Sequence, residues 1–219
     1  MNGPHSGAIA ASAGAPLAAS GAAMVMIHGR GDSAAGILSL AEVFDRPDIA
    51  YVAPQATHNT WYPNSFLVSL ADNEPWLGSA LEAMGAVVDA VAAAGMARER
   101  IVLLGFSQGA CLASEYAARN AARFGAVVAL SGGLIGPDGT TRDYGGSLQG
   151  TPVFLGCSDV DAHIPVARVH ETADVLAAMG ASVEKRIYPN FGHTVNQDEV
   201  DWVKGLLSEL LQDSRHLER

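Results

Sequence analysis

The sequence contains few cysteines and few basic residues. Among its 219 residues are two cysteines, Cys111 and Cys157, and 13 lysines and arginines against 23 aspartates and glutamates. Two cysteines cannot form a disulfide framework, so we expect two reduced core thiols in a cytoplasmic protein. The net charge of −10 repels phosphate backbones and anionic lipid surfaces. We therefore expect neither nucleic acid nor a membrane as a partner.

The sequence also lacks a long uninterrupted apolar span, and we expect no targeting segment. Its first 31 residues lack the basic start of a signal peptide, and Gly, Ser and Pro interrupt their apolar stretches. We interpret this stretch as a loose lead-in with one or two edge strands. No internal repeat at a fixed period is present. With 49% hydrophobic and 16% charged residues, the length favours a single domain with a sizeable core, spanning residues 1–219.

The sequence does contain an alternation of short apolar runs and longer amphipathic stretches. Continuous apolar runs of this length are typical of parallel strands that are covered on both faces, and the stretches between them predict helices. The alternation therefore predicts an α/β fold, with a doubly wound, mostly parallel sheet flanked by helices. The runs occupy residues 22–29, 49–54, 101–106, 126–133, 151–157 and 182–189, and the clearest helical stretches residues 73–95, 165–180 and 196–211.

The starts of these three helices carry capping signals. Asn73 is predicted as the N-cap of the first helix, with Pro75 in its first turn. Pro165 opens the second helix, and Asn196 and Glu199 have the spacing of a capping box at the start of the third. In a sheet of this kind, ligands bind outside the carboxyl ends of the strands. Functional residues are therefore expected in the loops that follow the apolar runs.

A serine lies between two glycines directly after the apolar run 101–106. Gly105, Ser107 and Gly109 form the pattern G-x-S-x-G. A sharp strand-to-helix turn leaves no room for side chains beside such a serine, and it places the N–H of Gln108 at a helix N-terminus, where negative charge is favoured. The serine is either an inert turn residue or a nucleophile. The strand before it and the helix after it favour the nucleophile.

A serine nucleophile needs a base, and His193 is positioned as one. It lies between the last predicted strand and the last predicted helix. The chain order serine, acid, histidine then places the acid after the preceding strand. Asp159 and Asp161 both stand there. One of them would be the acid and the other a residue that braces the turn. No pair of histidines has metal-ligand spacing supported by a third ligand, so we expect no metal.

The loop of residues 28–31, with the sequence HGRG, follows the first predicted parallel strand. Its glycines let the loop turn back, so that the N–H of Arg30 faces the Ser107 site as a second oxyanion donor beside that of Gln108. We expect His28 to hydrogen-bond within this loop. Four elements that follow four different strands thus combine into one predicted site, in which the serine attacks a carbonyl carbon.

These segments resemble the phospholipase/carboxylesterase family of α/β-hydrolases, which is related to acyl-protein thioesterases and similar to dienelactone hydrolases. The resemblance covers nearly the whole chain. It implies an α/β-hydrolase fold without a large lid, with Ser107 as nucleophile, His193 as base and the N–H groups of Arg30 and Gln108 as oxyanion hole. It is carried by the segments HGRG, APQATHNTWYP, GFSQGA, LSGGL, GCSDVDAHIP and YPNFGHTVNQDE.

The resemblance also bears on the acid. Family members commonly have D-P-x-[VI]-P, which DAHIP matches except for Ala162, and this favours Asp161 as the acid. The spacing G-x-x-D from the strand glycine favours Asp159 instead. Arg30 stands where thioesterase relatives frequently have an apolar residue. The nucleophile is a serine, whereas some dienelactone hydrolase-like relatives use a cysteine, and Cys111, one helical turn further on, is expected to point into the core.

The connection from residue 57 to residue 76 is unusually long for a strand-to-helix loop. Long loops in compact domains are frequently binding loops. Trp61, Tyr62 and Phe66 are therefore predicted to form an apolar substrate-binding wall. The alternative is that these aromatic side chains only pack the loop against the domain.

The side chain of Arg30 also has two alternative roles. Beside the reacting carbonyl, its guanidinium would be a bidentate donor for a carboxylate on the substrate. Alternatively, it turns away and pairs with Asp32 or Glu74.

The function predicted from these residues is that of a serine hydrolase without a cofactor, which cleaves small-molecule carboxylic esters of short to medium acyl chain. A hydrolase of dienelactone, other lactones or thioesters is an alternative that uses the same residues. A non-catalytic binding protein of this fold is an alternative of another class, disfavoured because all three predicted catalytic residues are present. The sequence leaves the oligomeric state open, a homodimer included.

Overall fold

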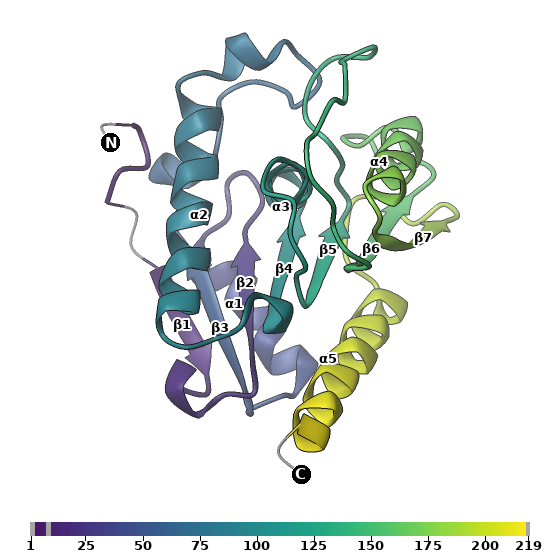
Figure 1. Ribbon diagram of the computed structural model, residues 1–219. Helices are drawn as coiled ribbons and strands as arrows, with labels where there is room; N and C mark the ends of the chain where they lie inside the picture. Colours follow the sequence, from purple (N-terminus) through teal and green to yellow (C-terminus); the bar gives the residue numbers. More distant parts are fainter. Residues whose placement is uncertain (1–2, 8–9, 218–219) are drawn as a thin grey trace.

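The computed structural model describes residues 3–7 and 10–217, with the side chains of residues 213–217 left out. Residues 1–2 and 8–9, which belong to the predicted lead-in, and residues 218–219 lie outside the described residues. Within the described chain there are seven strands and five α-helices (Figure 1). The strands are β1 (Ala10–Gly14), β2 (Ala22–Ile27), β3 (Ile49–Pro54), β4 (Ile101–Phe106), β5 (Ala126–Leu130), β6 (Pro152–Ser158) and β7 (Ser182–Tyr188). The helices are α1 (Ala34–Phe44), α2 (Trp76–Ala93), α3 (Gln108–Arg119), α4 (Val166–Ala178) and α5 (Gln197–Leu217).

The seven strands form one sheet in the order β1-β3-β2-β4-β5-β6-β7. All neighbouring strands pair in parallel except β1, which runs antiparallel to β3 at the edge. The predicted parallel α/β fold is therefore confirmed, and the lead-in contributes one edge strand. The carboxyl ends of β2 to β7 all lie at one edge of the sheet, where loops far apart in sequence meet.

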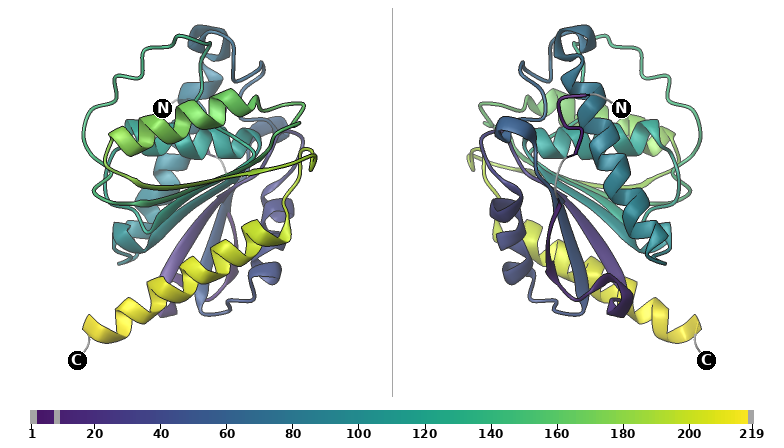
Figure 2. Two further views of the ribbon diagram at one scale, coloured as in Figure 1. Left: turned by 90° about the vertical axis from the view of Figure 1, so that its right-hand side faces the viewer. Right: turned by 90° about the vertical axis from the view of Figure 1, so that its left-hand side faces the viewer.

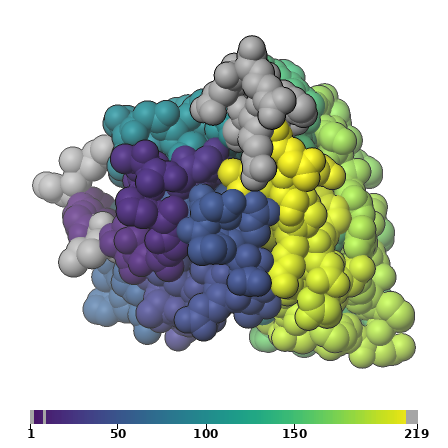
Figure 3. Space-filling model, turned by 90° about the horizontal axis from the view of Figure 1, so that it is seen from below, coloured from purple at the N-terminus to yellow at the C-terminus, as the bar shows by residue number. Residues whose placement is uncertain are grey.

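Helices cover both faces of the sheet (Figure 2). Along β2, alternate side chains enter two separate cores: Val25 and Ile27 pack with α2, α3 and α4, whereas Met24 and Met26 pack with α1 and α5. Helices α1 and α5 also contact each other. Figure 3 shows α5 (yellow) lying beside the blue segment that contains α1. This double burial is why the inner strands β2 to β5 are apolar along nearly their whole length, whereas the edge strand β7 contains charged residues.

The capping predictions have different outcomes. Asn196 and Glu199 form the predicted capping box at α5, since each backbone N–H donates to the side chain of the other residue at 2.8 and 3.0 Å. The prediction of Asn73 as the N-cap of α2 is wrong. Pro75 occupies that position, and the carboxylate of Glu74 accepts a hydrogen bond from the N–H of Gly78 in the first turn. Asn73 is instead buried in a short 3-10 turn.

One helix, α2, is long and apolar enough by length and composition alone to cross a membrane. A single such helix is weak evidence, because the core helix of a globular domain passes the same test. In this fold α2 buries one stripe, which includes Leu77, Met84 and Val88, in the core above the sheet.

Candidate active site

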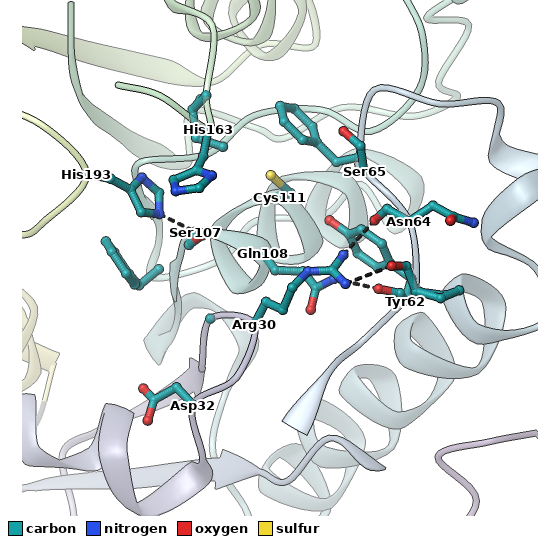
Figure 4. A pocket seen from close by; sticks show the side chains of 15 residues that line it. Arg30, Asp32, Tyr62, Asn64, Ser65, Ser107, Gln108, Cys111, His163 and His193 are labelled. Atoms are coloured by element: carbon teal, nitrogen blue, oxygen red, sulfur yellow. Dashed lines mark hydrogen bonds between the residues drawn. The ribbon is translucent and has the colours of Figure 1, made fainter. Parts of the chain in front are cut away.

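Ser107 lies in the sharp turn between β4 and α3, as the glycine pattern predicts. Its backbone has φ 55° and ψ −119°, a strained conformation for a residue with a side chain. A Cβ atom at Gly105 would collide with the backbone of Gly109, and one at Gly109 would collide with the carbonyl of Ile27. The two glycines therefore allow α3 to start directly against the neighbouring strand. This turn projects the serine into a pocket (Figure 4).

The structure brings Ser107, His193 and Asp161 together from three different loops. The Nε2 atom of His193 is 2.8 Å from the Ser107 Oγ, and its Nδ1 atom is 2.7 Å from Oδ2 of Asp161. In the neutral tautomer that fits both contacts, the serine hydroxyl donates to Nε2 and the Nδ1–H donates to the carboxylate. A hydroxyl, an imidazole and a carboxylate thus form one hydrogen-bonded chain.

The two candidate acids lie in different positions. The carboxylate of Asp161 is buried, and its second oxygen accepts the N–H groups of His163 and Ile164 at 2.8 and 3.0 Å. Burial raises the pKa of Asp161, but the hydrogen bond from His193 and those from the two N–H groups outweigh it and hold the pKa below its ordinary value. Asp159 accepts the N–H of Asn190 at 2.8 Å and braces the turn. Asp161 is therefore the aspartate that contacts the histidine.

His193 is enclosed by aromatic rings and a buried thiol lies behind its acid. The Phe106 ring centroid is 4.9 Å and the His163 centroid 4.8 Å from that of His193, the latter in an edge-on arrangement. The Cys157 thiol lies 3.7 Å from Oδ2 of Asp161. Neither His163 nor Cys157 could be predicted as a neighbour of the site, since His163 belongs to no motif and Cys157 lies in a predicted strand.

Two backbone N–H groups beside Ser107 have no acceptor. Gln108 opens α3, so its N–H is one of the free donors that every helix start has. The N–H of Arg30 likewise donates no hydrogen bond within the described part of the chain, and both residues line the pocket. His28 braces the loop before Arg30, because its Nδ1–H donates to the Gly29 carbonyl at 2.8 Å and its Nε2 accepts the N–H of Ala56.

The guanidinium of Arg30 contacts neither Asp32 nor Glu74. Its two terminal nitrogens donate instead to the backbone carbonyls of Pro63 and Asn64, at 2.8 and 2.6 Å. Arg30 thus joins the loop after β2 to the long loop after β3. The alternative in which Arg30 pairs with Asp32 or Glu74 is therefore wrong, since both terminal nitrogens bond these carbonyls.

The long loop contributes two of the three predicted aromatic residues to the pocket. Tyr62 and Phe66 line a cavity of about 460 Å³ that also contains Ser107 and His193. Trp61 does not line it, contrary to the prediction. Its indole is fully buried and donates to the His28 carbonyl at 2.9 Å, so Trp61 packs the loop down.

Two side chains hold this loop in a role that the sequence analysis did not assign to them. The side chain of Gln108 accepts the N–H of Trp61 at 2.9 Å and donates to the carbonyl of Tyr62 at 2.8 Å. Asn73 accepts the N–H of Asn64 and donates to the carbonyl of Ser65. The Gln108 contacts join residues 46 and 47 positions apart, whereas those of Asn73 join residues 8 and 9 positions apart within the same connection.

Neither cysteine is an alternative nucleophile in this geometry. Both are free and buried, and burial raises the pKa of each thiol to about 12. Cys111 nevertheless forms part of the pocket wall as well as the core. No cluster of three or more potential metal ligands occurs among the residues that the structure describes.

The phospholipase/carboxylesterase family model matches residues 11–211. The chain belongs to this family. Among curated members, it is 25% identical to acyl-protein thioesterase 1 of Gibberella zeae over 87% of this chain and 91% of that one. It is 24% identical to lysophospholipase-like protein 1 of Mus musculus over 86% of this chain and 87% of the relative. As a member of the phospholipase/carboxylesterase family, the protein is an ester-hydrolysing enzyme with an α/β-hydrolase fold.

A solved member of the family has nearly the same structure. The phospholipase/carboxylesterase from Dyadobacter fermentans DSM 18053 superposes with a TM-score of 0.88 at 42% identity, covering 92% of this chain and 96% of that one. Esterase PE8 superposes with a TM-score of 0.72 at 26% identity, over 93% and 99% of the two chains. The α/β-hydrolase fold predicted from the sequence is therefore confirmed.

Proposed function

We propose that this protein is a serine carboxylesterase that cleaves small esters of short to medium acyl chain through an acyl-enzyme. Ser107 is the nucleophile, His193 the base and Asp161 the acid. The observation that carries the proposal is the hydrogen-bonded chain from Asp161 through His193 to Ser107, which ends in a pocket with two free backbone N–H groups. A helix-capping or turn serine would not need such a chain.

In the first half of the reaction, the Ser107 Oγ attacks the ester carbonyl while His193 Nε2 takes its proton. The tetrahedral oxyanion accepts hydrogen bonds from the N–H groups of Arg30 and Gln108, and the α3 N-terminus favours its negative charge. Asp161 stabilises the imidazolium without taking its proton. Its lowered pKa supports this role, since the carboxylate stays ionised at neutral pH.

The second half of the reaction releases both products. His193 gives its proton to the leaving alcohol oxygen as the carbon–oxygen bond breaks, which leaves Ser107 acylated. A water molecule then loses a proton to His193 and attacks the acyl carbon. Collapse of the second tetrahedral intermediate returns the proton to the serine and releases the acid.

The pocket supports short and medium acyl groups. Its volume is about 460 Å³, and buried aromatic and aliphatic side chains, Tyr62, Phe66 and Ile164, line it beside the polar groups. Thioesters are a second candidate substrate class, favoured by the acyl-protein thioesterase relatives. The same residues would act on either substrate, because only the leaving atom differs.

The test is hydrolysis of p-nitrophenyl esters of increasing chain length, with a thioester alongside, by wild type and Ser107→Ala. Loss of the nucleophile should lower kcat by roughly 10⁶ and abolish labelling by a fluorophosphonate probe. His193→Ala should be comparably impaired. Ser114→Ala, on the same helix but buried with its hydroxyl on the Ala110 carbonyl, is the matched control and should keep wild-type activity. A Ser107→Ala enzyme with near-normal turnover would refute the mechanism.

A further inference from the structure

The hydroxyl of Tyr62 is a buried polar group in the pocket without an oxygen or nitrogen partner among the described residues. Tyr62 is 1% exposed, and the one group that its Oη contacts as a hydrogen-bond partner is the weakly bonding thiol of Cys111. Two other tyrosine hydroxyls have oxygen partners: that of the buried Tyr51 donates to the Arg46 carbonyl, and that of the half-buried Tyr144 to the carboxylate of Glu115. A buried, unpaired hydroxyl is costly to the fold, whereas a phenylalanine of the same shape is not.

The backbone of Tyr62 is held by hydrogen bonds, and its ring is packed in the core. Its carbonyl accepts hydrogen bonds from the Gln108 amide at 2.8 Å and from the Thr60 hydroxyl at 3.2 Å. On the other side of the loop, Phe66 is held by the N–H of Gly136 at 2.7 Å. The phenol is therefore a preorganised group in the pocket wall rather than a mobile one.

The hydroxyl lies near Cys111, which is one helical turn along α3 from the nucleophile. In Figure 4 the phenol points from its loop toward Cys111, whose N–H donates to the Ser107 carbonyl. One turn of helix is about 5–6 Å long. The nearest polar side chain, the Cys111 thiol, is a weak hydrogen-bonding group. Burial raises the pKa of Tyr62 well above its ordinary value, and Cys111 raises it further, so the phenol remains a proton donor.

We propose that the Tyr62 hydroxyl donates a hydrogen bond to an oxygen atom on the acyl chain of the substrate, which makes acyl groups with an ether, keto or hydroxyl oxygen the preferred class. The inference rests on the proposed function, since it places the acyl chain between Ser107 and Cys111. One helical turn separates Cys111 from Ser107, and a hydrogen bond of about 2.8 Å would join the phenol to the substrate oxygen. The remaining distance along the acyl chain corresponds to an oxygen a few atoms beyond the scissile carbonyl.

The test uses four p-nitrophenyl esters with chains of equal length: hexanoate, propoxyacetate, 3-ethoxypropanoate and 4-methoxybutanoate. The last three carry an ether oxygen at successive positions. Each is hydrolysed by wild type and by Tyr62→Phe, and the ratio of kcat/KM between the two enzymes is compared across the esters. Inductive effects of the ether oxygen cancel in that ratio. At least one ether ester should lose about tenfold more than hexanoate in the variant, the worth of one hydrogen bond.

Tyr51→Phe is the matched control, because it removes a partnered hydroxyl in the other core of the molecule. It should leave all four ratios unchanged. Thermal unfolding adds a readout independent of activity: Tyr62→Phe should unfold at the same or a higher temperature than wild type, whereas Tyr51→Phe should unfold at a lower one.

The outcomes separate the two proposals. If Tyr62→Phe slows all four esters equally or not at all, the acyl-oxygen contact is refuted while the esterase function stands. A lower unfolding temperature of Tyr62→Phe would also count against it, since the hydroxyl would then have a partner in the fold. If wild type hydrolyses none of the esters, the proposed function fails and this inference fails with it.

Discussion

The pocket has two sides, and different interactions hold them in place. The side that we propose to be catalytic consists of Ser107, Asp161 and His193, which follow strands β4, β6 and β7 of the same sheet. The backbone hydrogen bonds of the sheet therefore fix its geometry. The loop side, residues 60–66, contains neither a strand nor an α-helix. It is positioned by side chains that reach its backbone from elsewhere.

Because different interactions hold the two sides, we expect the catalytic side to determine the reaction and the loop side to determine which substrates fit. The catalytic side depends on the whole sheet, so changing its geometry means changing the fold. The loop side depends on Gln108, Asn73 and Arg30, each of which contacts backbone atoms of the loop. Single substitutions there should reshape the pocket while the catalytic side keeps its geometry. The predictions below test this separation, from the largest expected effect to the smallest.

On the catalytic side, Asp161→Asn should lower kcat by up to about 10⁴, because the amide cannot stabilise the imidazolium or fix the tautomer of His193. Asp159→Asn is the control. Its amide oxygen can still accept the N–H of Asn190, so activity should stay within a few fold of wild type. Steady-state kinetics on p-nitrophenyl butanoate would measure both. The reverse ranking would assign the acid to Asp159.

On the loop side, Gln108→Met should destabilise the protein by roughly 2–4 kcal/mol, because the buried N–H of Trp61 and the carbonyl of Tyr62 lose their partner. We expect KM to rise more than kcat falls, since the backbone N–H of residue 108 remains. Urea unfolding and steady-state kinetics measure the two effects. Ser114→Ala, on the same helix, should cost far less, and equal costs would mean that Gln108 does not hold the loop.

The same difference explains what the sequence could predict. The strands and the G-x-S-x-G turn are local patterns, and the order of strands brings their ends to one edge. Asp159 and Asp161 could not be separated from the residues alone, because both follow β6 and only the conformation of the turn directs Asp161 to His193.

The loop side was predicted less well. Apolar aromatic residues mark the loop, but hydropathy does not tell which of them face the pocket. Trp61 is buried because its indole N–H finds the His28 carbonyl, 33 residues away in sequence. Asn73 was predicted as a cap because asparagine is common there, but its amide is used by the loop. The Trp61 contact across 33 residues has no local signal, and the Asn73 contacts, 8 and 9 residues away, do not follow from the capping pattern.

Behind the catalytic side, Glu199 should make stability depend on pH. Burial raises the pKa of this carboxyl to about 7, although the hydrogen bond from the Asn196 N–H opposes it. The folded state therefore binds a proton that the unfolded state has lost between about pH 4.5 and 7. The contribution of Glu199 to the free energy of unfolding is therefore largest below this range. It falls by at most about 3 kcal/mol as pH rises through the range and does not change further above it.

Urea unfolding of wild type and Glu199→Gln between pH 5 and 8 measures this effect. The amide oxygen can still accept the Asn196 N–H but does not titrate, so the variant should lose part of the pH dependence. Asp201→Asn, on the same helix with an exposed side chain, is the control and should unfold with the wild-type dependence. Identical profiles of wild type and Glu199→Gln would show that the carboxyl titrates normally.

The smallest effect is expected at Arg30, where the two sides of the pocket meet. Its side chain is exposed and its terminal nitrogens are engaged by the Pro63 and Asn64 carbonyls, so Arg30→Leu should loosen the loop and raise KM only a few fold. Neutral esters and esters that carry a carboxylate should lose equally, because the guanidinium serves the loop. Arg30→Lys keeps the charge but not the two-pronged contact, and it should resemble Arg30→Leu. A loss confined to the carboxylate-bearing esters, with rescue by lysine, would instead assign Arg30 to substrate recognition.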